Sequence, residues 1–216
     1  MKLYNAGGSP NALRTRAVLY ELGIEFERID VDLRGGANRT PEYLKLNPNA
    51  KVPVLVDGDV VIWESRAINA YLAAKYPAKN LYPADLPTRA VIDQWSYWQA
   101  IHLGPAMQRV AFERVHKKAF GRGEPDEAVI AAEMKNVDQF LDVFEVGLSD
   151  GREWIAGSLS VADFALATTF VHRVAANLPV PSRPKVAAWI ERMEKRPSWQ
   201  HAVADMAPKP KATAAA

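Results

Sequence analysis

The chain has 216 residues, of which 49% are hydrophobic, and a formal net charge of +2. This composition predicts a globular protein of one domain or two small ones. The low net charge argues against a nucleic-acid partner. No apolar run approaches the roughly 18 residues that a membrane helix needs. The lack of cysteine excludes disulfides, thiolate metal sites and a protein thiol nucleophile, and Asn5 and Arg14 interrupt any N-terminal apolar segment, so we expect no secretory signal and a cytoplasmic protein.

The first part of the chain alternates between short strands and helices. Three helix starts carry a capping hydroxyl, at Ser9 before Pro10, at Thr40 and at Ser65, and Gly23 closes the first helix. Two apolar segments flank the turn DGD, which is a hairpin signal. The expected order is β-α-β-α-β-β-α. The segments are KLYN (2–5), SPNALRTRAVLYELG (9–23), the alternating Ile29 to Leu33, TPE (40–42), VPVLV (52–56), VVIW (60–63) and RAINAYLAAKY (66–76).

From Pro87 onward the strand signals vanish. Val91, Trp95, Trp98 and His102 keep helical spacing, which predicts a helix with a broad aromatic stripe. Further helices are expected around Val137 to Phe144, SVADFALATTFVHRVAANL (160–178) and KVAAWIERMEKR (185–196). The expected division is an α/β part at 1–78, a linker at 79–87, an all-helical part at 88–206 and a disordered tail at 207–216.

Three segments together resemble the glutathione transferase superfamily. They are SPNALRTRAVLYELG, KVPVLVDGDVVIWESRAINAYL and GSLSVADFAL, in this order, and the resemblance covers roughly residues 1–205. Within this superfamily, the chain is similar to the serine-type members (theta, delta, phi-like or bacterial). The resemblance implies an α+β chain in which a thioredoxin-like βαβαββα domain is followed by an all-α helical-bundle domain.

The resemblance also implies a role for Pro53, which lies near the start of an expected strand although it cannot donate a ladder hydrogen bond. In this family the proline follows a cis peptide bond. The backbone N–H and C=O of Val52 are then left to pair with the cysteinyl backbone of glutathione.

Glutathione carries charge at both ends, and the resemblance implies a receptor for each. Ser65, at a helix N-terminus, binds the γ-glutamyl carboxylate, and Glu64 takes the γ-glutamyl ammonium. Lys51 resembles the family residue that contacts the glycyl carboxylate, and Asn38 or Arg39 could contribute to the same contact.

Three residues are candidates for stabilising the glutathione thiolate. Ser9 stands where serine-type transferases place the serine that donates to the sulfur, and its helix N-terminus favours negative charge. Tyr4 lies close to the phenol of tyrosine-type relatives. Asn11 resembles the asparagine of relatives that use a Thr-x-Asn arrangement and favour disulfide chemistry. The sequence leaves these alternatives open, with Ser9 preferred.

In the helical half, Ser160 and Asp163 predict a capping box with a folding role. Trp95 and Trp98 are expected in the core or at a dimer contact. The wall for a hydrophobic substrate is assigned to His102, Met107 and Phe112. The four histidines show no metal-ligand spacing, so no metal site is expected.

The sequence therefore predicts a homodimeric glutathione transferase that conjugates the thiolate of its co-substrate, glutathione, to a small hydrophobic electrophile. One alternative is a glutathione-dependent disulfide or peroxide reductase, and another is a non-catalytic interaction module of the same fold. The retained KVP and ES segments argue against the module. The electrophile, the subclass and the physiological role cannot be read from the sequence.

Overall fold

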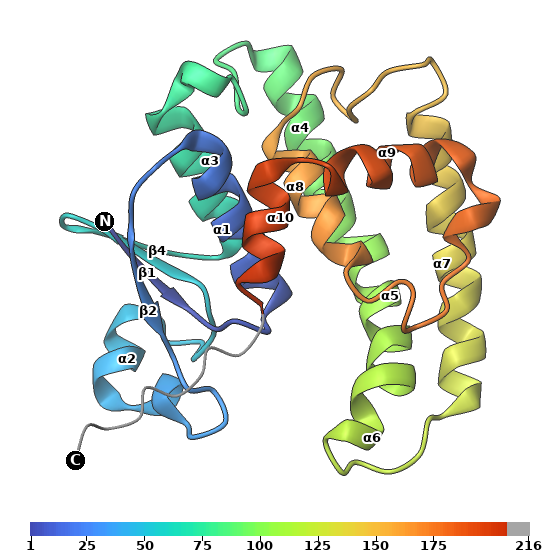
Figure 1. Cartoon of the computed structure of the whole chain (residues 1–216), viewed down its shortest axis with the longest axis horizontal. Coiled ribbons are helices and arrows are strands. Elements are labelled where there is room, and N and C mark those ends of the chain that lie inside the picture. Colours follow the sequence, from blue (N-terminus) through green and yellow to red (C-terminus); the bar gives the residue numbers. More distant parts are fainter. Residues whose placement is uncertain (207–216) are drawn as a thin grey trace. The chain divides into compact units, whose positions relative to one another are not determined.

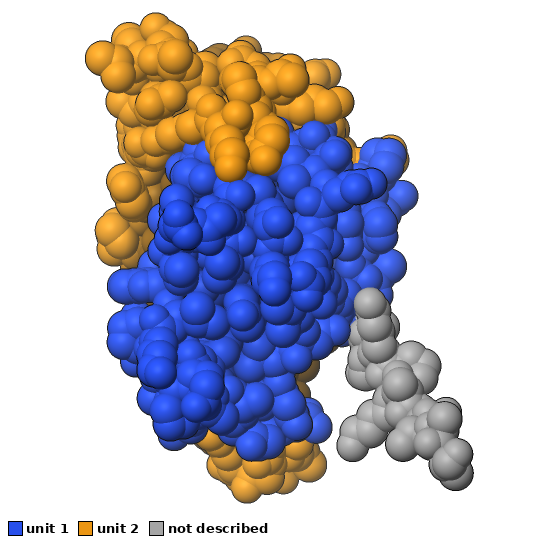
Figure 2. Space-filling view, turned by 90° about the vertical axis from the view of Figure 1, so that its left-hand side faces the viewer, with its two compact units in different colours: residues 1–72, 197–216 blue, residues 73–196 orange. Residues whose placement is uncertain are grey.

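The computed structural model describes residues 1–206, which form two units: residues 1–72 with 197–206 (unit 1) and residues 73–196 (unit 2) (Figure 2). The tail expected at 207–216 lies outside the described residues. The domain limits expected from the sequence stay a prediction. Within residues 1–206, no helix has both the length and the apolar character needed to cross a membrane.

Unit 1 is built on a four-stranded mixed sheet with the strand order β2-β1-β3-β4 (Figure 1). β1 is parallel to β2 and antiparallel to β3, and β3 forms a hairpin with β4. The thioredoxin-like part of the α+β prediction is thereby confirmed. The strands are β1 (Lys2–Asn5), β2 (Glu27–Asp30), β3 (Val54–Asp57) and β4 (Val60–Trp63).

Helices cover both faces of this sheet because side chains alternate along each strand. On one face, Leu3 and Leu55 pack against Leu19 of α1 and Ile68 of α3. On the other face, Val54 packs against Tyr43 of α2. The helices of unit 1 are α1 (Pro10–Leu22), the 3₁₀ helix η1 (Ala37–Arg39), α2 (Pro41–Leu46), α3 (Ser65–Lys75, whose last turn enters unit 2) and α10 (Pro197–Ala204).

Local capping sets the limits of α1 and α2, as predicted. The Ser9 side chain accepts from the Ala12 amide and Thr40 accepts from the Tyr43 amide, each at 3.3 Å. Gly23 ends α1 with φ +69°, a left-handed conformation that glycine adopts without steric cost.

Two limits in unit 1 differ from the prediction. The second strand ends at Asp30, because the Asp32 carboxylate accepts from the amides of Arg34 and Gly35 and turns the chain. The third helix begins at Ser65 itself, so Glu64 occupies the capping position, where its carbonyl accepts from the Ile68 amide at 3.0 Å.

The regular elements of unit 2, residues 73–196, are all helices, which confirms the all-α half of the fold prediction. Its elements are η2 (Pro77–Lys79), α4 (Leu86–Trp98), η3 (Gln99–Leu103), α5 (Gly104–Ala111), η4 (Phe112–His116), α6 (Lys117–Ala119), α7 (Glu127–Gly147), α8 (Val161–Ala167), η5 (Thr168–Phe170), η6 (Val180–Ser182) and α9 (Pro184–Glu194). The turns η3 and η4 are π-helical. At the first of them, Pro105 has no N–H to continue the α-helical ladder, and a side chain at Gly104 would approach the Gln99 carbonyl to 2.6 Å.

The two tryptophans of the α4 stripe pack against aromatic rings of unit 2. The Trp95 ring lies 5.1 Å from Trp98 and 6.0 Å from Phe144 of α7, and Phe144 lies 5.0 Å from Trp189 of α9. Both tryptophans are half-buried, so the choice between a core role and a dimer contact stays a prediction.

The capping box at the start of α8 is present and is completely buried. Asp163 accepts from the Ser160 amide and hydroxyl, the Ile155 amide and the Trp189 indole, at 2.9–3.0 Å. Burial raises the pKa of this carboxyl, although all of these hydrogen bonds oppose the rise. The expected single helix over 160–178 is wrong, because α8 ends at Ala167 and continues only as the short η5.

Candidate functional site

The N-terminus of α1 presents the Ser9 hydroxyl. Ser9 is half-buried, its amide donates to the Ala6 carbonyl at 3.0 Å, and its oxygen accepts from the Ala12 amide at 3.3 Å. A hydroxyl has one donor hydrogen besides its two acceptor lone pairs. Capping uses only the oxygen, so Ser9 keeps its hydrogen for a further acceptor.

The N-terminus of α3 presents a second serine. Ser65 is buried, with 3% of its surface exposed, and it is the first residue of the helix. Glu64, in front of it, is exposed and has φ +70°, a backbone conformation that non-glycine residues adopt mostly where the surrounding structure requires it.

The buried guanidinium of Arg14 connects these two helix starts. Its Nη1 donates to Ser65 Oγ at 2.6 Å and to Asn11 Oδ1 at 2.9 Å. Burial, followed by the charge of Arg66, lowers the pKa of Arg14, and the nearby Glu64 opposes the shift. The site is therefore a place where cationic groups and two helix N-termini meet, which favours an anionic ligand.

The segment before β3 is fixed from both sides. The Val52–Pro53 peptide bond is cis, as the resemblance implies. The ladder begins at Val54, so the sheet does not use the amide and carbonyl of Val52. The Lys51 carbonyl accepts from the Tyr43 hydroxyl and the Asn47 amide, each at 2.8 Å, which fastens the chain just before Val52.

Two exposed cations lie on segments that a hydrogen bond ties together. Asn38 of η1 donates to the Ala50 carbonyl at 2.6 Å. This bond joins the segment of Arg39 to the segment of Lys51, and both of these side chains are exposed. Of the two alternatives named from the sequence, the Asn38 amide is used to tie the loop, and Arg39 keeps an exposed charge.

The two other candidates for the thiolate contact also make contacts within unit 1. Tyr4 is half-buried on β1, and its ring meets the Tyr43 ring edge-on at 6.0 Å in the cluster that includes Val52. Asn11 is exposed, and its carbonyl oxygen accepts from Arg14.

Comparison with known proteins decides the family. The model of the glutathione S-transferase N-terminal domain matches residues 1–74, and that of the C-terminal domain matches residues 101–197. The chain belongs to the glutathione S-transferase family. Glutathione S-transferase 3 of Zea mays is 37% identical over 213 residues, which cover 94% of this chain and 93% of that protein. Glutathione S-transferase theta-3 of Mus musculus is 37% identical over 176 residues, which cover 80% of this chain and 73% of that protein.

A solved structure of this family is similar over almost the whole chain. Glutathione S-transferase I from maize, in complex with an atrazine–glutathione conjugate, is 31% identical with a TM-score of 0.88, covering 98% of this chain and 99% of that chain. The membership expected from the sequence is confirmed.

The residues assigned to the substrate wall differ in their exposure within unit 2. His102 is exposed, with its ring 5.4 Å from Phe140. Phe112 is half-buried and lines a cavity of about 540 Å³ with Pro105 and Val129, among others. Met107 is only 1% exposed, so its side chain belongs to the core and cannot offer a wall to a substrate.

Arg14 is the site residue that sequence reasoning missed. Five positions after Ser9, it occupies a turn of α1 whose neighbours Leu13 and Ala17 are buried apolar residues. A cation within an apolar helix face is a signal in itself, because a buried charge needs a partner. That partner, Ser65, is 51 residues away in sequence, so spacing along the chain does not identify it. Among residues 1–206, no group of three or more His, Asp or Glu side chains is placed to hold a metal ion.

Proposed function

We propose that this family member binds glutathione in unit 1, stabilises its thiol as thiolate and conjugates it to a hydrophobic electrophile. The observation that carries the proposal is the Arg14 guanidinium, which joins the N-terminal turns of α1 and α3 through Asn11 and Ser65. The α1 turn offers a hydroxyl hydrogen for sulfur, and the α3 turn offers donors for a carboxylate. The maize relative in complex with a glutathione conjugate supports the same reaction.

Three groups of contacts hold glutathione in this proposal. Its γ-glutamyl carboxylate takes the Ser65 hydroxyl and the amides at the start of α3, and Glu64 takes the ammonium. Its cysteinyl backbone pairs with Val52, whose amide and carbonyl the sheet leaves unused. Its glycyl carboxylate lies near Lys51 and Arg39, whose exposed charges come from two tied segments.

Ser9 stabilises the thiolate. A free thiol has a pKa of about 8.5, and a hydrogen bond to the charged sulfur, together with the α1 dipole, favours the thiolate at neutral pH. The sulfur then forms a bond to the electrophilic carbon, and the leaving group departs with its electron pair. No covalent enzyme intermediate is needed, because proximity and anion stabilisation lower the barrier. His102 and Phe112 remain the proposed contacts of the electrophile.

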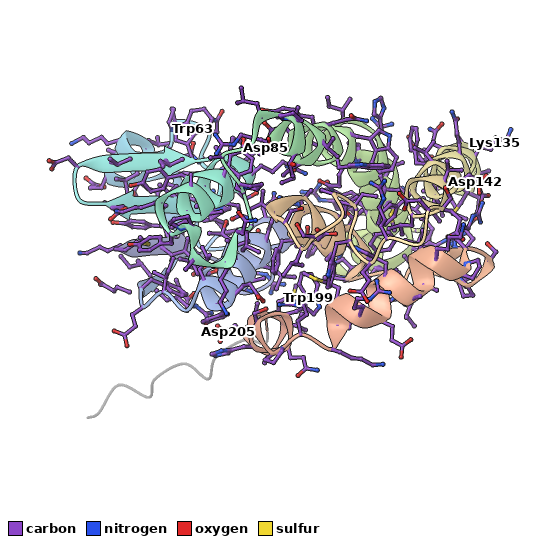
Figure 3. The ribbon with its side chains drawn as sticks, turned by 90° about the horizontal axis from the view of Figure 1, so that it is seen from above. Trp63, Asp85, Lys135, Asp142, Trp199 and Asp205 are labelled. Atoms are coloured by element: carbon purple, nitrogen blue, oxygen red, sulfur yellow. The ribbon has the colours of Figure 1, made fainter. Side chains whose placement is uncertain are left out.

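We propose further that two copies of the chain associate and work in the cytoplasm. Tyr97 and Ile101, four residues apart, are 62% and 66% exposed, and the edge strand β4 exposes Val61 and Trp63 (Trp63 is labelled in Figure 3). Exposed apolar groups on an edge strand favour a partner. The reducing glutathione pool of the cytosol supplies the co-substrate. Analytical ultracentrifugation tests the dimer, and cell fractionation tests the location.

Calorimetry and two assays test the function. We expect glutathione binding, and conjugation to an aryl halide that exceeds the uncatalysed rate. Efficient reduction of mixed disulfides or peroxides without conjugation would favour the reductase alternative. Absence of glutathione binding would favour the interaction module.

A further inference from the structure

Arg16 is a second buried arginine in α1, and none of its contacts is to a candidate ligand-binding side chain. It is 0% exposed and lies between the buried Thr15 and Ala17. Burial, followed by the nearby charge of Arg28, lowers the pKa of Arg16 to about 10, so the guanidinium is still cationic at neutral pH. A charge held in such a place requires hydrogen-bond acceptors around it.

The acceptors of Arg16 come from three segments. Nη1 donates to the side-chain oxygen of Asn5, at the end of β1. Nη2 donates to the Gly7 carbonyl at 3.4 Å and to the Ala202 carbonyl at 3.2 Å. Gly7 lies inside the turn that the Ser9 amide closes on the Ala6 carbonyl. One side chain therefore connects the turn that presents Ser9 to α10, which packs on α1 in unit 1 (Figure 1).

The neighbouring contacts fix both ends of this connection. The Asn5 side chain, which accepts from Arg16, also donates to Asp30 at 2.6 Å and is thereby held at the end of β2. Directly after α10, the Asp205 carboxylate accepts from the Tyr20 hydroxyl at 2.5 Å and lies 3.0 Å from Arg28 (Asp205 is labelled in Figure 3). The guanidinium is thus anchored between a strand end and a helix that is itself tied down.

We infer that Arg16 is a positioning residue for Ser9: by holding the Gly7 carbonyl against α10, it fixes the turn that aims the Ser9 hydroxyl at the glutathione sulfur. The inference rests on the proposed function. Hydrogen bonds weaken steeply when their geometry is lost, so a loosened turn stabilises the thiolate less. Ligand binding at the α3 N-terminus does not involve this turn and stays intact.

The test compares Arg16→Met with Arg28→Met in the full chain. Both changes remove a cation that contacts α10 or the residue that follows it, although Arg28 is only half-buried. In the part of the chain that the structure describes, Arg28 bonds to Asp30 and Asp205 and makes no bond to residues 6–9. Arg16→Lys is the second variant, which keeps the charge and the apolar part of the side chain. A single ammonium group cannot reproduce a planar guanidinium whose two terminal nitrogens donate to Asn5 and to two carbonyls.

The readouts are glutathione affinity by calorimetry and the pKa of the bound thiol by ultraviolet titration. In Arg16→Met we expect the thiol pKa to rise by about half to one unit and turnover at pH 6.5 to fall roughly three- to tenfold, with recovery at high pH. Affinity should stay within about threefold. Arg16→Lys should shift the pKa in the same direction by less, and Arg28→Met should leave it at the wild-type value.

Each outcome separates the inference from the proposed function. If wild type binds glutathione and lowers its thiol pKa, but both folded Arg16 variants match Arg28→Met, the positioning role is wrong. If Arg16→Met does not fold, the pKa in Arg16→Lys decides in the same way. If wild type itself neither binds glutathione nor lowers its thiol pKa, the proposed function fails before Arg16 is tested.

Discussion

Replacing Ser65 with alanine removes the proposed receptor for the γ-glutamyl carboxylate. Ser65 is 3% exposed, and its oxygen already accepts from Arg14 at 2.6 Å. Its hydrogen is therefore left for the ligand. Loss of a hydrogen bond to a charged group costs about 1.5–3 kcal/mol, which corresponds to roughly 10- to 100-fold in the glutathione dissociation constant.

The same change has a second consequence inside the protein. Arg14 loses one of its acceptors while it keeps Asn11. Loss of a hydrogen bond to a charged group costs about 1.5–3 kcal/mol, so we expect the free energy of unfolding to fall by up to this amount.

Calorimetric titration with glutathione measures the binding loss, and urea denaturation measures the stability loss. Ser160→Ala is the matched control, because Ser160 is also a buried serine at a helix start, but in unit 2. We expect it to lower stability with unchanged affinity. If Ser65→Ala binds glutathione within about twofold of Ser160→Ala, the carboxylate receptor is assigned wrongly.

Three further predictions concern stability. Asp163→Ala leaves four buried donors without an acceptor, so it should lower the free energy of unfolding by about 3–5 kcal/mol in denaturant titrations, whereas a loss below 1 kcal/mol would contradict this. Burial and the Asp205 bond raise the pKa of Tyr20 from 10.0 to about 12, so its contribution is complete below pH 10 and is lost toward pH 12. Tyr20→Phe should therefore lose less stability than wild type between pH 8 and 11, and equal losses would refute this. Gly147→Ala places a Cβ 2.6 Å from the Trp95 ring, so thermal unfolding should show a lower melting temperature and a loss of about 1–3 kcal/mol in the free energy of unfolding, and an unchanged melting temperature would contradict this.

The sequence predicts those parts of the fold that local rules determine. Ser9 and Pro10 start α1 and Gly23 ends it because capping and backbone conformation act within one turn. The β-α-β-α-β-β-α order of residues 1–72 follows from periodicity for the same reason, whereas the place of α10 in unit 1 was not predicted. The capping box at Ser160 and Asp163 is equally local.

Features that depend on distant contacts were not predictable in this way. Arg14 meets Ser65 across 51 residues, and Arg16 meets Ala202 across 186. Met107 is an apolar residue of the kind that lines a hydrophobic substrate pocket, but helix packing buries its side chain. The end of β2 is a different case, because the alternation through Leu33 continues past a turn that Asp32 makes with its own side chain.

The most direct test of the account is an ultraviolet titration of the thiolate in bound glutathione. A hydrogen bond from Ser9 worth about 1.5–3 kcal/mol lowers the thiol pKa by roughly one to two units below the free value of about 8.5. We expect this pKa to be low in wild type and to rise in Ser9→Ala, while glutathione affinity changes only a few-fold. A pKa that stays unchanged in Ser9→Ala but rises in Tyr4→Phe or Asn11→Ala would contradict the account and leave Ser9 as a helix cap alone.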